Sequence, residues 1–205
     1  MGTRHWSWAV VLLAATGFAV PAAAQVPLEP ARLGVTVTAG PWRASATRVR
    51  ALYPGTFVPV AIEADLRLQG RLFVFGGGQF IRQGGEIVLV QPPVPEERLP
   101  LKLKMSSARA GAGAAFPWNR WVFLAAGGVS YVQFEERWTG EDIPPVSGSS
   151  VGLILLGGVE YRVSRRFSAV WRIEYARTPV DKALQAVSTF DLSGLAVTGG
   201  IGVRF

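Results

Sequence analysis

From residue 25 onward, hydrophobic and polar residues alternate along the chain, which is the pattern of β-strands whose two faces meet different surroundings. The segment 195–205 shows the alternation most clearly, because Leu195, Val197, Ile201 and Val203 share one face. Small or polar side chains occupy the other face, namely Ala196, Thr198, Gly200, Gly202 and Arg204. The end of the chain is therefore predicted to be a strand with one bulky apolar face and one small polar face.

Most of the remaining chain repeats this pattern. Clean or weaker alternation covers six further segments, at 33–40, 58–68, 101–116, 121–135, 151–163 and 167–177. In 101–116 the phase slips near Ser106 and Ser107, as a β-bulge would cause. Segment 71–82 fits both phases, so its inward face stays open. We expect about eight strands of roughly 9–13 residues.

The links between these strands predict the topology. Short links lie at Gln69-Gly70, 117–120 and 164–166. Long links lie at about 43–57, 83–99, 139–149 and 178–189. Short and long links alternate, and with an even number of strands both chain ends then fall on the side of the short turns. The predicted fold class is all-β: an eight-stranded antiparallel up-and-down transmembrane β-barrel with short periplasmic turns and longer external loops.

The composition of the two faces indicates which one points outward. A secreted soluble barrel, such as a lipocalin-like ligand carrier, would also alternate, but with its apolar face inside. Here the polar face is rich in Gly, Ala, Ser and Thr, with a few charges of both signs. The interior of an eight-stranded barrel is only just wide enough for side chains, so small residues suit it better than bulky ones. We expect the apolar face to contact lipid, with the soluble carrier as an alternative.

Residues 1–24 have the features of a secretory signal peptide. Arg4 supplies a positive start, an apolar run extends from about Trp8 to Val20, and small residues precede Gln25 as a cleavage site requires. The run is shorter than the roughly 20 residues of a membrane-spanning helix, which disfavours an N-terminal anchor. We therefore expect a barrel domain over 25–205.

Composition narrows the chemistry further. The chain has 205 residues, 49% of them hydrophobic and 17% charged, with no cysteine and a single histidine, His5, inside the expected signal peptide. A mature chain without Cys or His has no Ser-His or Cys-His nucleophile and no histidine metal ligand. We expect no enzyme activity, catalytic residue, cofactor or metal. Without Arg4 the mature chain has 20 basic and 14 acidic residues, and this dispersed charge of +6 does not indicate a nucleic-acid partner.

Charged residues on the polar face are expected to fill the lumen. They are Glu63, Asp65, Arg67, Lys102, Lys104, Arg109, Glu160, Arg162, Arg172, Glu174 and Arg204. An unpaired ion in a narrow lumen is costly, so opposite charges should pair. A tight turn at 164–166 would place Val170 opposite Glu160, with Arg172 within diagonal reach. This pattern favours a plugged barrel with a structural or surface-interaction role, and a narrow porin-like pore for ions or small solutes is the alternative.

Aromatic residues are predicted to form two girdles at opposite ends of the strands, as interfacial aromatics do in membrane barrels. Near the short turns lie Trp118, Trp121, Tyr161 and Phe167. Toward the long loops lie Trp42, Tyr53, Tyr131, Trp138 and Tyr175.

Two sequence stretches resemble those of a known group. The hairpin 157–177 (GGVEYRVSRRFSAVWRIEYAR) and the ending 198–205 (TGGIGVRF) are similar to the small eight-stranded outer-membrane barrels of the OmpA/OmpX-like group. The resemblance implies location in a bacterial outer membrane. It also implies that the last strand, with Val203 and Phe205, acts as the signal read by the barrel-assembly machinery. We expect no peptidoglycan-binding domain, since the chain stops at Phe205.

Two long links suggest partners. The segment 42–57 carries Arg43, Arg48 and Arg50, which could contact lipopolysaccharide phosphates beside the outer-membrane lipid. The segment 83–100 joins an apolar β-prone run to a proline-rich tip, which suggests a protruding edge that could bind a surface protein by β-augmentation. Solvated loop charges and a flexible loop are the simpler alternatives. We expect the protein to be monomeric.

Overall fold

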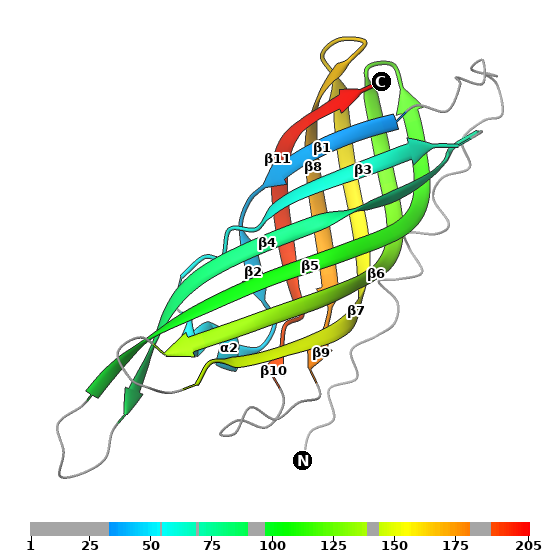
Figure 1. The fold of residues 1–205 in the computed structure, drawn as a ribbon. Helices are drawn as coiled ribbons and strands as arrows, with labels where there is room; N and C mark the ends of the chain where they lie inside the picture. The colour runs from blue at the N-terminus through cyan, green and yellow to red at the C-terminus, as the bar shows by residue number, and fades with distance from the viewer. Residues whose placement is uncertain (1–32, 54, 69, 90–96, 139–143, 181–189) are drawn as a thin grey trace, which may run out of the picture.

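Eight antiparallel strands close into a single barrel (Figure 1). The computed structural model describes residues 33–53, 55–68, 70–89, 97–138, 144–180 and 190–205, so the expected signal peptide lies outside it. In spatial order the strands are β1 (Leu33–Ala39), β3 (Val60–Arg67), β4 (Leu72–Leu89), β5 (Glu97–Trp118), β6 (Trp121–Trp138), β7 (Val146–Arg162), β8 (Phe167–Arg177) and β11 (Gly194–Arg204). Pairing of β11 with β1 closes the barrel. No helix in these ranges is long and apolar enough to cross a membrane.

The bulky face of the strands points outward. Ile201 is 65% exposed, Ile173 57% and Trp171 51%, whereas Arg172 is buried. This is the reverse of a soluble carrier, whose apolar face lines the interior. The predicted all-β, eight-stranded up-and-down barrel is confirmed. Segment 71–82, left open by its sequence, has Phe73 and Phe75 inside.

Three short turns gather at one end of the barrel, called here the turn end, together with the C-terminus (Figure 1). Gly70 in the first turn and Asn119 in the second have positive φ angles of 75° and 55°. In the third turn, the Ser164 hydroxyl accepts hydrogen bonds from the backbone N–H groups of Arg166 and Phe167. This turn places Glu160 opposite Val170, as predicted.

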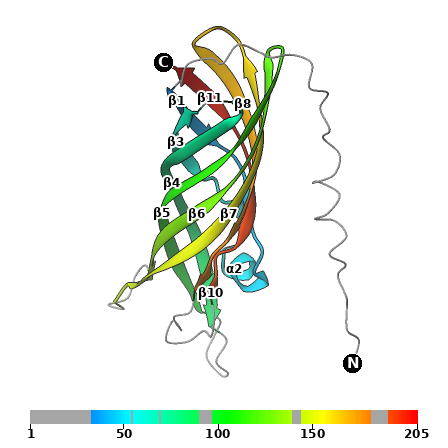
Figure 2. The same ribbon diagram turned by 90° about the vertical axis from the view of Figure 1, so that its right-hand side faces the viewer.

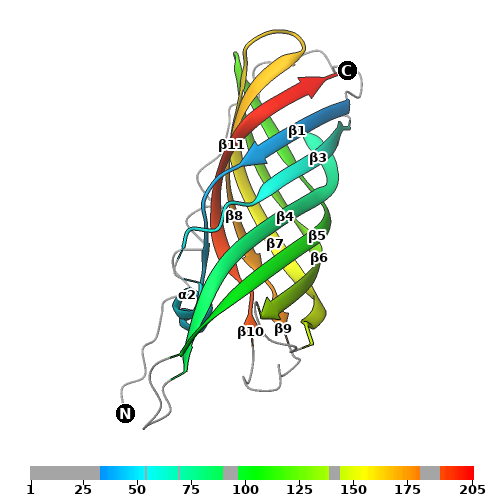
Figure 3. The same cartoon turned by 60° about the vertical axis from the view of Figure 1, so that its left-hand side comes forward.

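At the other end, the loop end, the four strands β4 to β7 are longer than the others, and the hairpin of β4 and β5 reaches farthest from the barrel (Figure 3). They are 18, 22, 18 and 17 residues long, so the predicted lengths of 9–13 were wrong for them. The predicted links 83–99 and 139–149 were also too long, because β4 and β5 pair out to Leu89 and Glu97 and β7 begins at Val146. The strands continue because their backbone pairing is unbroken. No bulge interrupts β5 near Ser106, whose pairing with both neighbours is continuous.

The first long link folds into the loop end instead of extending outward. Here β2 (Trp42–Ala44) pairs with β11, and α2 (Thr47–Leu52) follows it. In Figure 2, α2 lies at the end opposite the C-terminus. A short pair of strands, β9 (Pro179–Val180) and β10 (Phe190–Asp191), lies nearby in the fourth link. The interior at this end is therefore packed with side chains from the link as well as from the barrel.

Candidate functional site

Four charged side chains form an ion-pair network near the turn end of the lumen, called here the turn-end network. The Arg204 guanidinium donates to Asp65 Oδ2 at 2.7 Å and to Glu160 Oε2 at 2.8 Å. Arg67 Nη2 reaches the same Glu160 oxygen at 2.8 Å. These residues come from β3, β7 and β11, and β3 and β7 are four places apart around the eight-stranded wall. The network therefore bridges the lumen from side to side.

A second network, the mid-lumen network, lies one step closer to the loops. Arg109 Nε lies 2.7 Å from Glu63 Oε1, and Arg109 Nη1 donates to Glu174 Oε2 at 2.5 Å. Arg172 pairs with the other oxygen of Glu63. Each network holds two arginines and two carboxylates, so each is neutral by itself. Buried charges that are paired in this way avoid the cost of an isolated ion.

Glycines leave the space that these arginines need. A Cβ at Gly34 would lie 2.6 Å from both Arg204 Nη1 and Asp65 Oδ1. Two small cavities border the networks, with volumes of about 10 Å³ beside Arg204 and about 30 Å³ beside Arg109. A water needs roughly 10–15 Å³, so these spaces hold only one or two waters each. The lumen at this level is filled by protein.

Two of the eleven predicted lumen charges lie elsewhere, and a third, Arg162, takes no part in the two networks. Lys102 and Lys104 point outward, while Leu101 and Leu103 are 1% exposed inside, so the prediction for both lysines was wrong. The expected bulge had shifted the phase of their strand, and without it the alternate residues face inward. Arg162 is half-buried at the turn end, close enough to Glu160 for their charges to interact. The other eight form the two networks.

The loop end of the lumen is closed by an apolar cluster, the loop-end core, that the sequence did not reveal. Its buried members are Trp42, Ala44, Val49, Tyr53, Phe57, Ile81, Leu101, Leu103, Val132, Phe134, Leu192 and Ala196. The Trp42 and Phe57 rings meet edge to face at 4.8 Å. Assignment of Trp42 and Tyr53 to an outer girdle was wrong, because they are 6% and 1% exposed inside the barrel. The link that carries them folds inward.

One polar group is built into this core. The Tyr53 hydroxyl donates a hydrogen bond of 2.8 Å to Glu136 Oε1, and both side chains are buried. Burial, together with the neighbouring Glu136 charge, raises the pKa of the Tyr53 phenol far above its ordinary value. Tyr53 therefore stays protonated and remains a donor to Glu136 at all ordinary pH values.

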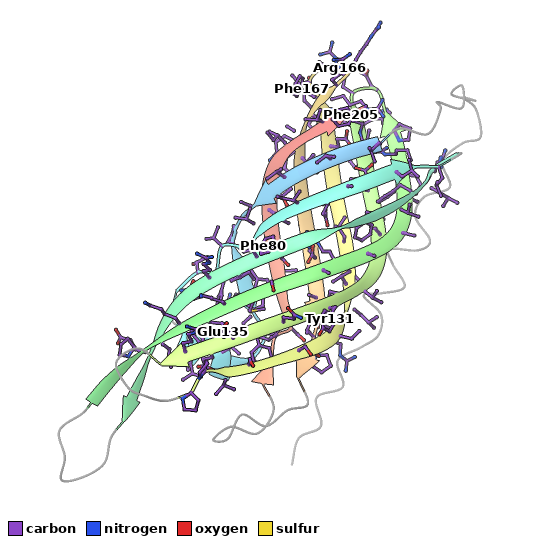
Figure 4. All side chains as sticks on the ribbon, viewed as in Figure 1. Phe80, Tyr131, Glu135, Arg166, Phe167 and Phe205 are labelled. Atoms are coloured by element: carbon purple, nitrogen blue, oxygen red, sulfur yellow. The ribbon has the colours of Figure 1, made fainter. Side chains whose placement is uncertain are left out.

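The remaining aromatic residues define an apolar belt on the outer surface, and Phe80, Tyr131 and Phe167 are labelled in Figure 4. Trp118 and Phe167 are exposed at the turn end, where Trp121 and Tyr161 are in ring contact at 4.7 Å. Tyr131, Tyr175 and the unanticipated Phe80 are exposed toward the loops. The side chain of Trp138 lies outside the described residues. From Trp121 to Tyr131 the belt is roughly 23 Å tall along the barrel axis, for a strand rise of about 3.3 Å per residue and a strand tilt of about 45°.

Beyond this belt, the strands β4 to β7 form an extension whose outer strands lack barrel neighbours. Pairing of β3 with β4 ends at Val60 and Phe80, so 81–89 of β4 has no strand partner on that side among the described residues. The inner face of this stretch is covered, because a Cβ at Gly85 would meet the Leu52 carbonyl oxygen and the Tyr53 ring. The extension thus presents a backbone edge at 81–89.

Comparison with known proteins agrees with this geometry. The model of the outer membrane protein beta-barrel domain matches residues 10–205. The chain belongs to the outer membrane protein beta-barrel domain family. It is a protein of the bacterial outer membrane, and the apolar belt is its lipid-facing surface. A comparison with curated proteins finds no match.

Solved structures show the same fold at low sequence identity. The attachment invasion locus protein Ail of Yersinia pestis, in complex with the heparin analogue sucrose octasulfate, has a TM-score of 0.53 and 12% identity, over 85% of this chain and 97% of Ail. Neisserial surface protein A has a TM-score of 0.52 and 15% identity, over 85% and 95%. A major outer membrane protein from Thermus thermophilus has a TM-score of 0.53 and 15% identity, over 86% and 100%.

In this outer-membrane barrel the two ends of the strands meet different surroundings. Within the belt, lipid lies outside, and the charges face the lumen. Beyond the belt, lipid headgroups and water lie outside, so Lys102 and Lys104 point outward and Leu101 and Leu103 pack inward. The signal that could have revealed this is the run from Leu101 to Lys104, where apolar and basic residues alternate in one unbroken phase.

Proposed function

We propose that this protein is a closed barrel that acts through its external surface and not as a channel. The support is that side chains fill the lumen at three successive levels. These levels are the turn-end network, the mid-lumen network and the loop-end core. Two neutral ionic layers leave no excess of fixed charge to attract one kind of ion. The apolar layer offers ions no replacement for their hydration.

The test is conductance of the purified protein in planar lipid bilayers. A closed barrel should show small or no conductance at moderate voltage, with no dependence on the sign of the ion. Stable channels of nanosiemens order would contradict the proposal and favour the alternative of a narrow pore. Circular dichroism of the same preparation should show β-structure, so that a silent bilayer is not the result of unfolded protein.

For the external surface, we propose that the segment 83–100 binds a surface protein partner by β-augmentation. The support is the edge of β4 at 81–89, since backbone N–H and C=O groups there can pair with an added strand. Pairing of β4 with β5 out to Leu89 and Glu97 holds this edge beyond the lipid.

Residues 86–89 of this edge can be removed, together with 90–97, without touching the barrel wall. Replacement of 86–97 by an Asn-Gly turn should leave folding intact, because the described residues at both ends of this stretch belong to the outermost part of the β4–β5 hairpin. Binding to whichever surface protein the wild type captures in a cell-adhesion assay should be lost. The control replaces 139–143, the link between β6 and β7, by the same turn and should keep the binding. Equal binding by both variants would contradict the proposal.

We make further proposals about lipopolysaccharide contact, barrel assembly, oligomeric state and enzyme activity. Arg43 and Arg50 are exposed on the first link, where they can meet lipopolysaccharide phosphates. Phe205 is 74% exposed at the turn end, accessible to the barrel-assembly machinery, and Val203 pairs with Val35 beside it. We propose a monomer without cofactor or nucleic-acid partner. We also propose no enzyme activity, because residues 25–205 contain no Cys or His to serve as a nucleophile or its base.

A further inference from the structure

The outer face of the extension carries two cations that form no ion pair among the described residues. Arg82 on β4 lies directly opposite Lys104 on β5. On β6, Arg137 lies opposite Lys102, and Glu135 lies opposite Lys104. Like charges in directly opposed positions destabilise a sheet. Glu135 pairs with Arg137, whereas Arg82 and Lys104 have no ion-pair partner among the described residues. The sheet tolerates an arrangement that an external anion would stabilise.

These two cations line an open groove of about 910 Å³ on the outer surface. Its apolar end is formed by Val58, Val60 and Phe80, which are 54%, 43% and 56% exposed. The end farther from the barrel carries Arg82, Lys104 and Glu135, and the Glu135 charge is already paired with Arg137. The groove is therefore amphiphilic, with an apolar floor that leads to a cationic rim.

The position of the groove relative to the membrane decides what can occupy it. Phe80 and Tyr131 mark the loop-end border of the apolar belt (Figure 4). Arg82 lies two residues beyond Phe80 on the same face, a rise of about 5 Å at a tilt of about 45°. The cations therefore stand at headgroup depth while the apolar floor stands at the level of the acyl chains. A molecule embedded in the outer leaflet can enter from the side.

We propose that this groove is a binding site for a lipid of the outer leaflet whose headgroup carries phosphate. The Arg82 guanidinium and the Lys104 ammonium bind the phosphate, and an acyl chain packs along Phe80 and Val60. Arg82 supplies a planar fork for two phosphate oxygens, and Lys104 a compact charge beside it. This inference rests on the proposed function, in which the extension lies outside the membrane. To that function it adds a class of partner, a phosphate-bearing lipid, and the residues that bind it.

The test measures lipid binding by native mass spectrometry of the barrel in neutral detergent, with purified lipid A as the probe. Wild type should retain lipid A in preference to phosphatidylcholine, and added salt should weaken this preference. The variant Arg82→Gln/Lys104→Gln should lose about tenfold or more in lipid A affinity. The control Arg165→Gln/Arg166→Gln removes the same charge from two exposed residues at the turn end and should retain the wild-type affinity.

A second variant tests the proposal in the opposite direction. Glu135→Gln removes the acidic group beside Lys104 and frees Arg137, so lipid A affinity should rise. Equal loss in the Arg82/Lys104 and Arg165/Arg166 variants would show only a general charge effect and overturn the site. So would wild-type affinity in the Arg82→Gln/Lys104→Gln variant, or preference of the groove for a soluble acidic peptide. Conductance of the same samples tests the closed barrel separately.

Discussion

Single residues in this barrel are placed by the polarity of what surrounds them. Glu63 and Arg109 pair across a narrow lumen, whereas Lys102 faces water beyond the membrane. Sequence alternation could predict the first two, because glycines and charges share one face along the lipid-facing part of the strands. It could not predict the inward fold of Trp42 and Tyr53, since nothing in a link of polar and apolar residues fixes which side it packs against.

The Tyr53–Glu136 hydrogen bond gives a prediction at this scale. Tyr53→Phe removes only the hydroxyl and leaves the buried Glu136 without this donor. The free energy of unfolding should fall by about 1–3 kcal/mol, measured by denaturant titration in detergent micelles. Tyr131→Phe, at a position 45% exposed, is the control and should change little. Equal effects of the two substitutions would refute the role given to the buried pair.

The same tyrosine predicts a pH dependence. Burial raises the pKa of Tyr53 above its ordinary value of 10.0, so above that pH the unfolded chain loses the phenolic proton and the folded chain keeps it. The contribution of Tyr53 is therefore fully present below pH 10.0 and declines as the pH rises beyond it. Denaturant titrations from about pH 8 to about pH 11 should show this decline in wild type. If the free energy of unfolding of Tyr53→Phe declined with pH as steeply as that of the wild type, the decline would belong to other groups.

At the level of elements, the sequence predicts which face of a strand points outward wherever the alternation keeps one phase. It does not predict the length of the strand. The alternation in 58–68, 167–177 and 195–205 assigned the outer faces correctly, because bulky residues fill only one side. The lengths of β4 and β5 were missed because Gly84, Gly85 and the prolines near 92–95 have the composition of a loop. Pairing with a neighbouring strand, which local composition does not report, extends the sheet through the glycines.

The seam between β1 and β11 gives a prediction for the elements. At Gly200 a Cβ would collide with the backbone carbonyl oxygen of Val37 and lie 2.8 Å from Thr38 Cα. Gly200→Ala should force the strands apart and lower stability by about 1–3 kcal/mol, through strain in a close-packed contact. Gly157→Ala is the control, since its Cβ would have no atom within 4 Å. Thermal unfolding followed by circular dichroism should separate them, and equal midpoints would contradict close approach at the seam.

For the whole molecule, the lumen is closed by ionic and apolar layers in series, each built by different elements. The networks use side chains from the barrel strands, whereas the loop-end core depends on the link that carries β2 and α2. Because an ion must pass both layers one after the other, either layer alone still blocks the ion current after the other has been opened. The layers should therefore be separable by substitution.

This arrangement predicts how the channel could be opened. Glu63→Gln/Glu160→Gln neutralises one carboxylate in each network, and the loop-end core should still keep the bilayer silent. Replacement of 46–56 by a short Gly-Ser link removes α2 and Tyr53 from the core, and the ionic networks should keep this variant silent as well. The combined variant should conduct, and the excess of lumen arginines should make it favour anions. Conductance in either single variant would show that one layer alone closes the barrel. Silence of the combined variant, with β-structure retained by circular dichroism, would place the closure at the apolar residues around Phe73 and Phe75.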